Sequence, residues 1–293
     1  MQRDETPLRR IAADFAESKL ALSGLALLAL ILLAALFAPL ISPQNPYDLA
    51  QLNVQDSRLP PGARSGEGLT FWLGSDDQGR DILSGIFYGL RISLVVGVAS
   101  TLCAVIIGLT LGLCAAYFGG RTDSLIMRLV DIQLSFPAIL IALILLALLG
   151  QGIAKTIFAL ITVQWAYYAR TVRSTALIER RKEYIEAAVC LALPPARIVF
   201  RHLLPNCLPP LFVIATVQVA AAIALEATLS YLGIGVPITE PSLGLLIKNG
   251  FDYMLSGKYW ISFFPGIALL LTIVSINLVA DQLRDVLNPR LQK

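Results

Sequence analysis

The chain has 293 residues, of which 56% are hydrophobic and only 15% are charged, against about 25% charged residues in soluble domains. So few polar side chains cannot cover a soluble core of this size, which excludes a soluble enzyme, a disordered chain and a nucleic-acid-binding protein. The net charge of +3 is too small to indicate an anionic partner, and the single histidine excludes a multi-histidine metal site.

Six stretches of the chain lack charged residues and are predicted to be transmembrane helices. About 20 apolar residues cross the ~30 Å hydrocarbon layer as a helix, and a lipid-exposed backbone must satisfy its hydrogen bonds internally. The fourth stretch is the shortest and reaches this length if Lys155 extends to the interface. The sequence therefore predicts an all-α, polytopic membrane protein. The charge-free stretches are 20–47, 92–120, 132–154, 156–169, 203–225 and 259–280.

The distribution of Lys and Arg predicts that both termini lie in the cytoplasm. With this orientation the inward segments hold more than twice as many basic residues as the outward segments, in agreement with the positive-inside rule. The expected organisation is a cytoplasmic segment at 1–19, a first transmembrane helix at 20–42, an outward (periplasmic) loop with an amphipathic helix at 43–90, a transmembrane domain of five helices at 91–285 and a cytoplasmic tail at 286–293.

The outward loop carries a charged cluster of Asp76, Asp77, Arg80 and Asp81. One interpretation is that these residues contact a partner protein at the outer face, which the family resemblance given below implies to be an extracytoplasmic binding protein that delivers a substrate. The alternative is local: Asp76 or Asp77 caps an amphipathic helix at residues 79–90, and Arg80 pairs with a neighbour. The segment supplies too few converging ligands for a metal site.

The inward loop at residues 170–206 carries most of the functional signal. A helix is predicted from Lys182 to Leu193, and Pro194-Pro195 ends it, because the residue before a proline avoids the α conformation. Pro195 begins a second short helix, which Pro205 is expected to stop. A bent pair of helices with a small apolar face suits docking into a groove of another protein. The alternative is a helical hairpin that lies on the bilayer surface.

This loop resembles the EAA loop of bacterial ATP-binding cassette (ABC) importers in its residues Glu186-Ala187-Ala188, a turn at Ala192 and Leu204-Pro205. In that family the loop forms the coupling helix, which sits in a cleft of the ATPase subunit. The turn position is usually glycine, and we expect alanine to be tolerated here if its φ is negative. The ATPase-coupling residues implied by the resemblance are Glu183, Glu186, Ala187, Ala188, Ala192 and Arg197.

Several further segments, in the family's order, resemble the C-type permease subunits of dipeptide and oligopeptide importers. The resemblance implies a type I ABC importer permease fold and a permease subunit that translocates di- and oligopeptides across the bacterial inner membrane. Such a subunit is not an enzyme, and no catalytic or metal-binding residue is assigned. The matching segments are 71–84, 117–121, 127–132, 226–235, 265–266 and 277–289.

The fifth predicted span is expected to continue past Glu226 to about residue 234. It carries Gln218, Ala222 and Glu226 at spacings of four, which places them on one helix face. An ionisable group at membrane depth is costly and usually faces a cavity or a partner. This face is therefore a candidate lining of the translocation path, where Glu226 would contact the ammonium group of a peptide. The alternative places Glu226 at the outer interface, hydrogen-bonded to neighbouring loops.

The resemblance also implies the partners of the chain. They are a homologous second permease subunit, two ABC ATPase subunits, a periplasmic or lipoprotein solute-binding protein, the peptide substrate and membrane lipid, with no nucleic acid. The ATPase subunits bind ATP and Mg, whereas this chain binds no cofactor and lacks the GxxxxGKS/T run of an ATPase. Two alternatives stay open: a permease for nickel, glutathione or another small solute of the same branch, and a self-contained secondary transporter, which needs several intramembrane ionisable residues.

Overall fold

The protein is mostly helical within residues 13–48, 52–66, 68–237 and 239–287, which the computed structural model describes. The shorter elements are a two-residue hairpin of β1 (Ala63–Arg64) and β2 (Thr70–Phe71) and the helical turns η2 (Val54–Asp56), η3 (Val199–Leu203) and η4 (Met254–Ser256). The helices are α2 (Lys19–Leu36), α3 (Ala38–Ile41), α4 (Ile82–Phe118), α5 (Gly120–Ser135), α6 (Ala138–Leu149), α7 (Ile153–Glu179), α8 (Glu183–Cys190), α9 (Pro195–Ile198), α10 (Leu204–Tyr231), α11 (Leu243–Phe251) and α12 (Trp260–Leu287).

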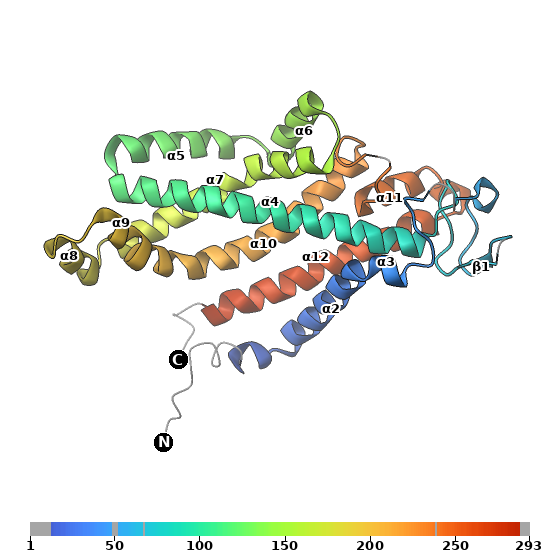
Figure 1. The fold of residues 1–293 in the computed structure, drawn as a ribbon, viewed down its shortest axis with the longest axis horizontal. Coiled ribbons are helices and arrows are strands. Elements are labelled where there is room, and N and C mark those ends of the chain that lie inside the picture. The colour runs from blue at the N-terminus through green and yellow to red at the C-terminus, as the bar shows by residue number, and fades with distance from the viewer. Residues whose placement is uncertain (1–12, 49–51, 67, 238, 288–293) are drawn as a thin grey trace, which may run out of the picture.

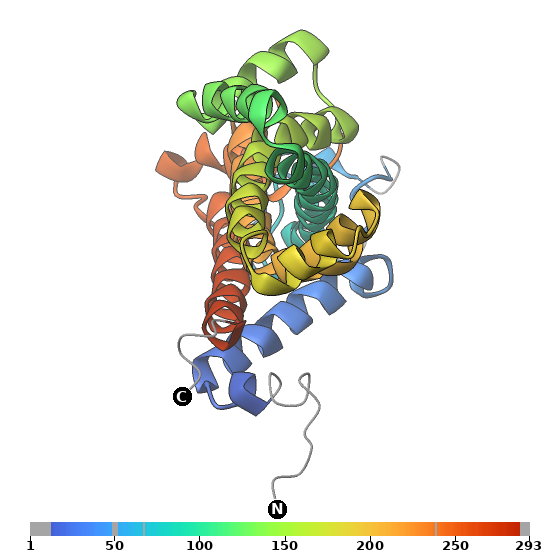
Figure 2. The ribbon, with the colours of Figure 1, turned by 90° about the vertical axis from the view of Figure 1, so that its left-hand side faces the viewer.

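The long helices run roughly along the long axis of the molecule, and the short elements gather at its two ends (Figure 1). The hairpin, α3 and α11 lie at one end, which we call the outer end. The segment 180–203, with α8 and α9, lies at the opposite end, which we call the loop end. Seen from that side, α8 and α9 cross in front of the long helices (Figure 2). The two segments with predicted functions are therefore separated by the length of the bundle.

Four helical segments of the described chain are long and apolar enough to cross a membrane, namely 19–36, 82–118, 195–231 and 260–287. The helices α5 and α6 pass the same test together, but the pair is bent by 90°. These four or five spans confirm the predicted all-α, polytopic class. The remaining predicted span corresponds to α7, which packs closely along α4 and has 27 residues. At 1.5 Å per residue α7 is about 40 Å long, and its crossing of the bilayer stays a prediction.

The prediction of one continuous helix at 132–154 is wrong. Phe136 precedes Pro137, and its φ of −100° and ψ of 144° are those of an extended residue, because a proline disfavours the α conformation in the residue before it. The chain therefore leaves α5 at Ser135, turns sharply, and starts α6 at Ala138. The bend follows from a local steric effect rather than from tertiary packing.

The predicted amphipathic helix at 79–90 is also wrong as a separate element. Gly79 has a φ of +77°, and a Cβ atom at this position would clash with the Asn53 carbonyl group, so the chain cannot be helical there. The helix begins instead at Ile82 and continues without a break to Phe118. Its cap is Asp81, whose carboxylate accepts a hydrogen bond from the Ser84 backbone N–H at 2.8 Å.

Close contact between α4 and α7 forms the centre of the bundle. Gly108 and Gly112 of α4 face α7 so closely that an added Cβ atom would lie 2.6 Å from the Trp165 carbonyl oxygen and 2.7 Å from the Ala169 carbonyl oxygen, respectively. In lipid, where helices gain little from hydrophobic burial, such small residues allow the backbones to approach. The α4–α7 pair is thus the frame against which α10 and the loop end are placed.

Candidate functional site

The segment that connects α7 to α10 at the loop end is shorter than the predicted loop at 170–206. The helix α7 continues through Glu179, and α10 begins at Leu204. The connection therefore consists of residues 180–203, which contain α8 and α9. The contacts that anchor α8 in the bundle determine which of its residues are exposed.

One face of α8 is anchored in the bundle. Ile185 and Ala188 are 2% and 4% exposed and belong to a hydrophobic cluster that includes Ala176 of α7 and Cys207 of α10. Val189, which the sequence places on the same apolar face, is 58% exposed. The buried strip is therefore narrow, and most of the surface of α8 points away from the chain.

The exposed surface of α8 carries the predicted coupling residues. Glu183 and Glu186 lie in its first turn, where the helix dipole favours negative charge. The structure thus divides the predicted set into one anchor, Ala188, and a surface-exposed group. The exposed members are Glu183, Glu186, Ala187, Ala192 and Arg197.

The helix α8 ends three residues before the predicted end at Leu193, in a Schellman motif. The Ala192 N–H donates to the Val189 carbonyl group at 2.9 Å, and the Leu193 N–H donates to the Ala188 carbonyl group at 3.2 Å. Ala192 has a φ of +52°, so the negative φ on which the predicted tolerance of alanine depends is not present. A left-handed alanine costs about 1–2 kcal/mol, and the two hydrogen bonds hold the turn in spite of this cost.

The prediction that Pro205 stops the second helix is wrong as well. The elements α9, η3 and α10 form one helical segment from Pro195 to Tyr231. In η3 the Leu204 N–H bonds to the Val199 carbonyl group, five residues earlier, which makes the turn wider than an α-helical turn. Pro205 follows in the first turn of α10, where a missing N–H is tolerated. The loop end is therefore continuous with a membrane-spanning helix.

Four polar side chains join the loop end to this helix. Glu179 accepts hydrogen bonds from Lys182 Nζ at 2.6 Å and from the Tyr184 hydroxyl at 2.7 Å. Asn206 Nδ2 donates to the Tyr184 hydroxyl at 3.1 Å. Burial, together with the charge of Glu179, raises the pKa of Tyr184 to about 12, so the hydroxyl keeps its proton. We call Glu179, Lys182, Tyr184 and Asn206 the loop clamp.

Sequence reasoning missed the loop clamp. The spacing of three between Glu179 and Lys182 is a local signal of an ion pair, but Tyr184 and Asn206 are 22 residues apart. Their contact depends on the turn after α8 and on the continuity of η3 with α10, neither of which was predicted correctly.

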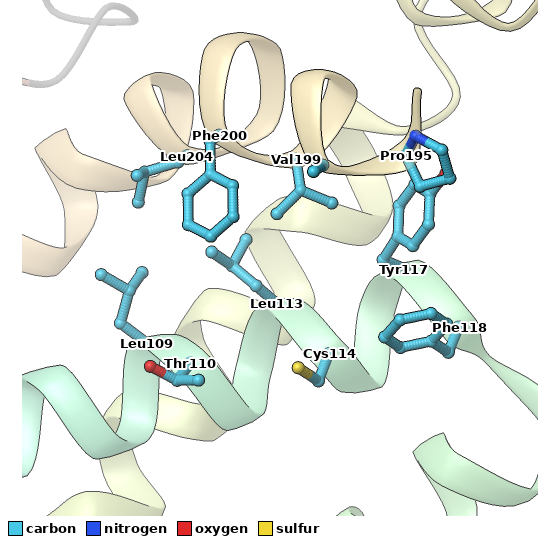
Figure 3. Close-up of a pocket in the computed structure, with 11 residues that line it drawn as sticks. Leu109, Thr110, Leu113, Cys114, Tyr117, Phe118, Pro195, Val199, Phe200 and Leu204 are labelled. Carbon is cyan, nitrogen blue, oxygen red and sulfur yellow. The ribbon is translucent and has the colours of Figure 1, made fainter. Parts of the chain in front are cut away.

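An apolar groove of about 430 Å³ separates the start of α10 from the end of α4. Leu113 and Tyr117 of α4 face Val199 and Phe200 across it (Figure 3). At the Tyr117 end, the guanidinium of Arg180 lies 5.7 Å from the Tyr117 ring centre and donates to the Ala116 carbonyl group at 2.9 Å. The start of α10 is thus tied to α7 and α8 by the polar clamp, whereas its packing against this part of α4 is apolar and leaves the groove at its edge.

The acidic group of the fifth predicted span is buried inside the chain. Glu226 is fully buried and accepts hydrogen bonds from the Ser93 hydroxyl of α4 at 2.8 Å and from the Ser230 hydroxyl at 2.7 Å. Ala222 is 1% exposed, and Gln218 is half-buried. The alternative in which Glu226 is hydrogen-bonded to neighbours fits this geometry, although its partner Ser93 comes from a helix. The role of this face in a translocation path stays a prediction.

The charged cluster of the outer end is mostly buried. Asp76, Arg80 and Asp81 are 1%, 5% and 1% exposed, and only Asp77 of the four is half-buried. Asp76 Oδ1 accepts from the backbone N–H groups of Gln78 and Arg80, both at 2.8 Å. Burial is the main cause that raises the pKa of Asp76 to about 6. Three of the four predicted binding-protein contacts are therefore buried, and the residue that caps the helix is Asp81 rather than Asp76 or Asp77. The pairing of Arg80 with a neighbour stays a prediction.

Two family models match the chain. Residues 104–293 match the model of the binding-protein-dependent transport system inner membrane component. Residues 6–61 match the model of the N-terminal transmembrane domain of oligopeptide transport permease C. Within the described residues no group of three or more His, Cys, Asp or Glu side chains could hold a metal ion.

Individual relatives agree with these matches over nearly the whole chain. The di/tripeptide transport system permease protein DppC of Pseudomonas aeruginosa is 37% identical, over 98% of this chain and 93% of the relative. The oligopeptide transport system permease protein OppC of Bacillus subtilis is 37% identical, over 95% and 88%. A chain of the inward-facing MetNI methionine ABC transporter has a similar fold, with a TM-score of 0.56 and 22% identity over 70% of this chain and 96% of that chain. The chain therefore belongs to the family of inner-membrane components of binding-protein-dependent transport systems.

Proposed function

We propose that the chain is the permease subunit of an ATP-driven importer for di- and oligopeptides. As a member of its family it is an inner-membrane transport component and not an enzyme. The peptide substrate is inferred from relatives that are named for di/tripeptide and oligopeptide transport and align over nearly the whole chain. Nickel, glutathione or another small solute is the outcome that would correct this part of the proposal.

The proposal for energy coupling rests on the exposed surface of α8. Glu183, Glu186 and Ala187 point away from the chain, while Ile185 and Ala188 hold α8 against the bundle. A short helix that is anchored on one side and charged on the other suits the cleft of an ATPase subunit. When ATP and Mg close two such partner subunits, α8 would move with them as a rigid body and shift the helices that it contacts.

The proposed complex contains a homologous second permease subunit, two ATPase subunits and a periplasmic or lipid-anchored solute-binding protein. This chain itself would hold no cofactor. The binding protein would dock at the outer end. Asp77 is the member of the predicted charged cluster that is accessible there, since Asp76, Arg80 and Asp81 are buried.

A charge reversal on α8 tests the coupling proposal. Glu186→Arg places the opposite charge on the proposed docking surface, and we expect uptake to fall more than about tenfold because the ATPase subunits no longer bind. The measurement is co-purification of the ATPase subunits together with uptake of a radiolabelled dipeptide in membrane vesicles. Glu17→Arg, the same reversal at an exposed acid before α2, is the control and should change neither. Normal ATPase retention and uptake in Glu186→Arg would refute the role of α8.

A further inference from the structure

The loop clamp connects three elements through one hydroxyl group. The Tyr184 hydroxyl donates to Glu179 Oε2 at 2.7 Å and accepts from Asn206 Nδ2 at 3.1 Å. Glu179 is the last residue of α7, Tyr184 lies in the first turn of α8, and Asn206 lies in the first turn of α10. A displacement of α8 therefore acts directly on the start of α10.

The environment of the clamp makes this connection firm. The side chain of Glu179 is only 12% exposed, so its carboxylate depends on its donors. Hydrogen bonds to an ionised group are stronger than neutral ones. Asn206 is fixed in addition by the hydrogen bond from its Nδ2 to the His202 carbonyl group at 2.7 Å, and the Tyr184 and His202 rings lie 6.5 Å apart. The hydroxyl is thus held from both sides.

At the loop end, the start of α10 makes its polar contact with the neighbouring helices through the loop clamp. The apolar groove lies between residues 199–204 and the end of α4, and Leu113 of α4 joins Leu203 and Cys207 in an apolar cluster, so the attachment of α4 to the start of α10 is apolar. Apolar contacts of Ile185 and Ala188 with Cys207 and Leu211 join α8 to α10, but such contacts are non-directional and allow sliding. The hydrogen bonds of the clamp set the position of α8 relative to α10.

We propose that Tyr184, together with Glu179 and Asn206, transmits the movement of α8 to α10 as a set of positioning residues. This inference rests on the proposed function, because it requires that a partner ATPase moves α8. It adds the route by which the movement enters a membrane-spanning helix. The docking surface, with Glu183 and Glu186, and the transmitting group, with Tyr184, are then separate and can be changed independently.

The test measures hydrogen exchange in the complete importer, purified with its partner subunits in nanodiscs, with and without ATP and vanadate. In the wild type we expect ATP to change the exchange of α8 and of residues 199–208. In Tyr184→Phe, which keeps the ring but removes the hydroxyl, α8 should still respond. The variant loses both hydrogen bonds of the hydroxyl, of which the one with Asn206 joins α8 to α10. Loss of that bond should reduce the response of residues 199–208 about fivefold.

Two further variants separate a transmitting role from a merely structural one. Tyr167→Phe, the same change on an exposed tyrosine of α7 whose hydroxyl makes no hydrogen bond within the described residues, should behave as the wild type. Asn206→Ala should give the same loss as Tyr184→Phe, and the double variant should be no worse than either, because all three remove one connection.

The outcomes distinguish the inference from the function on which it rests. A full response of residues 199–208 in Tyr184→Phe would overturn the transmitting role, while the coupling proposal would stand if α8 still responds and Glu186→Arg still loses the ATPase subunits. No response of α8 to ATP in the wild type would overturn both. Loss of the response in α8 itself in Tyr184→Phe would show that the hydroxyl only maintains the fold of the loop end.

Discussion

The two ends of the bundle treat their charged side chains in opposite ways. At the outer end, Asp76 and Asp81 are 1% exposed, and each uses one carboxyl oxygen to accept hydrogen bonds from its own segment. At the loop end, Glu183 and Glu186 are exposed, and apolar residues anchor α8. Acidic side chains are thus buried within the chain in the first region and left available to a partner on α8. A cluster of charges in the sequence is thus not by itself a sign of a contact surface.

The comparison of the two ends predicts its largest effect on stability at Asp76. Its pKa of about 6 lies above the value of 3.8 for an ordinary aspartate, so the folded outer end binds the proton more tightly than the unfolded segment. Its stability is therefore highest below pH 4 and decreases by about 2–3 kcal/mol as the pH rises to 6, with little further loss above. Hydrogen exchange of residues 74–82, corrected for intrinsic rates, measures this slope.

Asp76→Asn is the matched variant for this pH dependence. The amide keeps the acceptor for the backbone N–H groups of Gln78 and Arg80 but does not ionise, so the slope should become shallower and the segment should be better protected at pH 7. The remaining slope comes from Asp81, whose pKa is also raised by burial. Asp77→Asn, at the half-buried neighbour, should keep the slope. If Asp76→Asn has the same pH profile as the wild type, the outer end does not depend on this carboxyl group.

A smaller effect is expected at the helix cap of the outer end. Asp81→Ala removes the acceptor of the Ser84 N–H and hydroxyl groups, and we expect a loss of about 1–2 kcal/mol in stability. Asp81→Asn should restore most of it, since asparagine is an equally good cap. Thermal unfolding of the purified protein measures both, and an equal loss in the two variants would mean that the charge, not the cap, matters.

The smallest effect concerns the strained turn of the loop end. Ala192→Gly removes the cost of a left-handed alanine, and we expect a gain of up to about 1 kcal/mol after the greater flexibility of glycine in the unfolded chain is subtracted. Exchange of the Leu193 amide, which donates to Ala188, should slow accordingly. Ala187→Gly, inside α8, should have the opposite sign. Faster exchange in Ala192→Gly would show that the turn is not strained.

Much of the fold could be predicted because its signal is local in sequence. Charge-free stretches marked the long apolar helices, and the residues Glu186-Ala187-Ala188 marked the segment for which we propose a coupling role. The wrong predictions concern residue types that can occupy two different backbone structures. Pro137 ends a helix, whereas Pro205 follows a widened turn and is accommodated within one. Ala192 adopts a left-handed backbone conformation because of the hydrogen bonds around it, and the helix propensity of alanine does not include these hydrogen bonds.

The candidate site was predictable in its exposed part and not in its buried part. The periodicity of α8 indicates which residues share a face, but it does not say which part of that face meets the bundle. Val189 and Ile185 look equivalent in the sequence and differ in the structure. The contact between Tyr184 and Asn206 joins two helices, and only the tertiary arrangement brings them together.

The carboxyl group of Glu226 restricts how two of the long helices can be aligned. It takes hydrogen bonds from Ser93 of α4 and from Ser230 of α10, and an acid without donors in hydrocarbon would cost several kcal/mol. Sliding α10 along α4 by one turn, about 5.4 Å, would separate this acid from Ser93. Ser230 lies on α10 itself and would remain as a donor, so the hydrogen bond from Ser93 favours, near Glu226, a single register of the two helices and their movement as a pair.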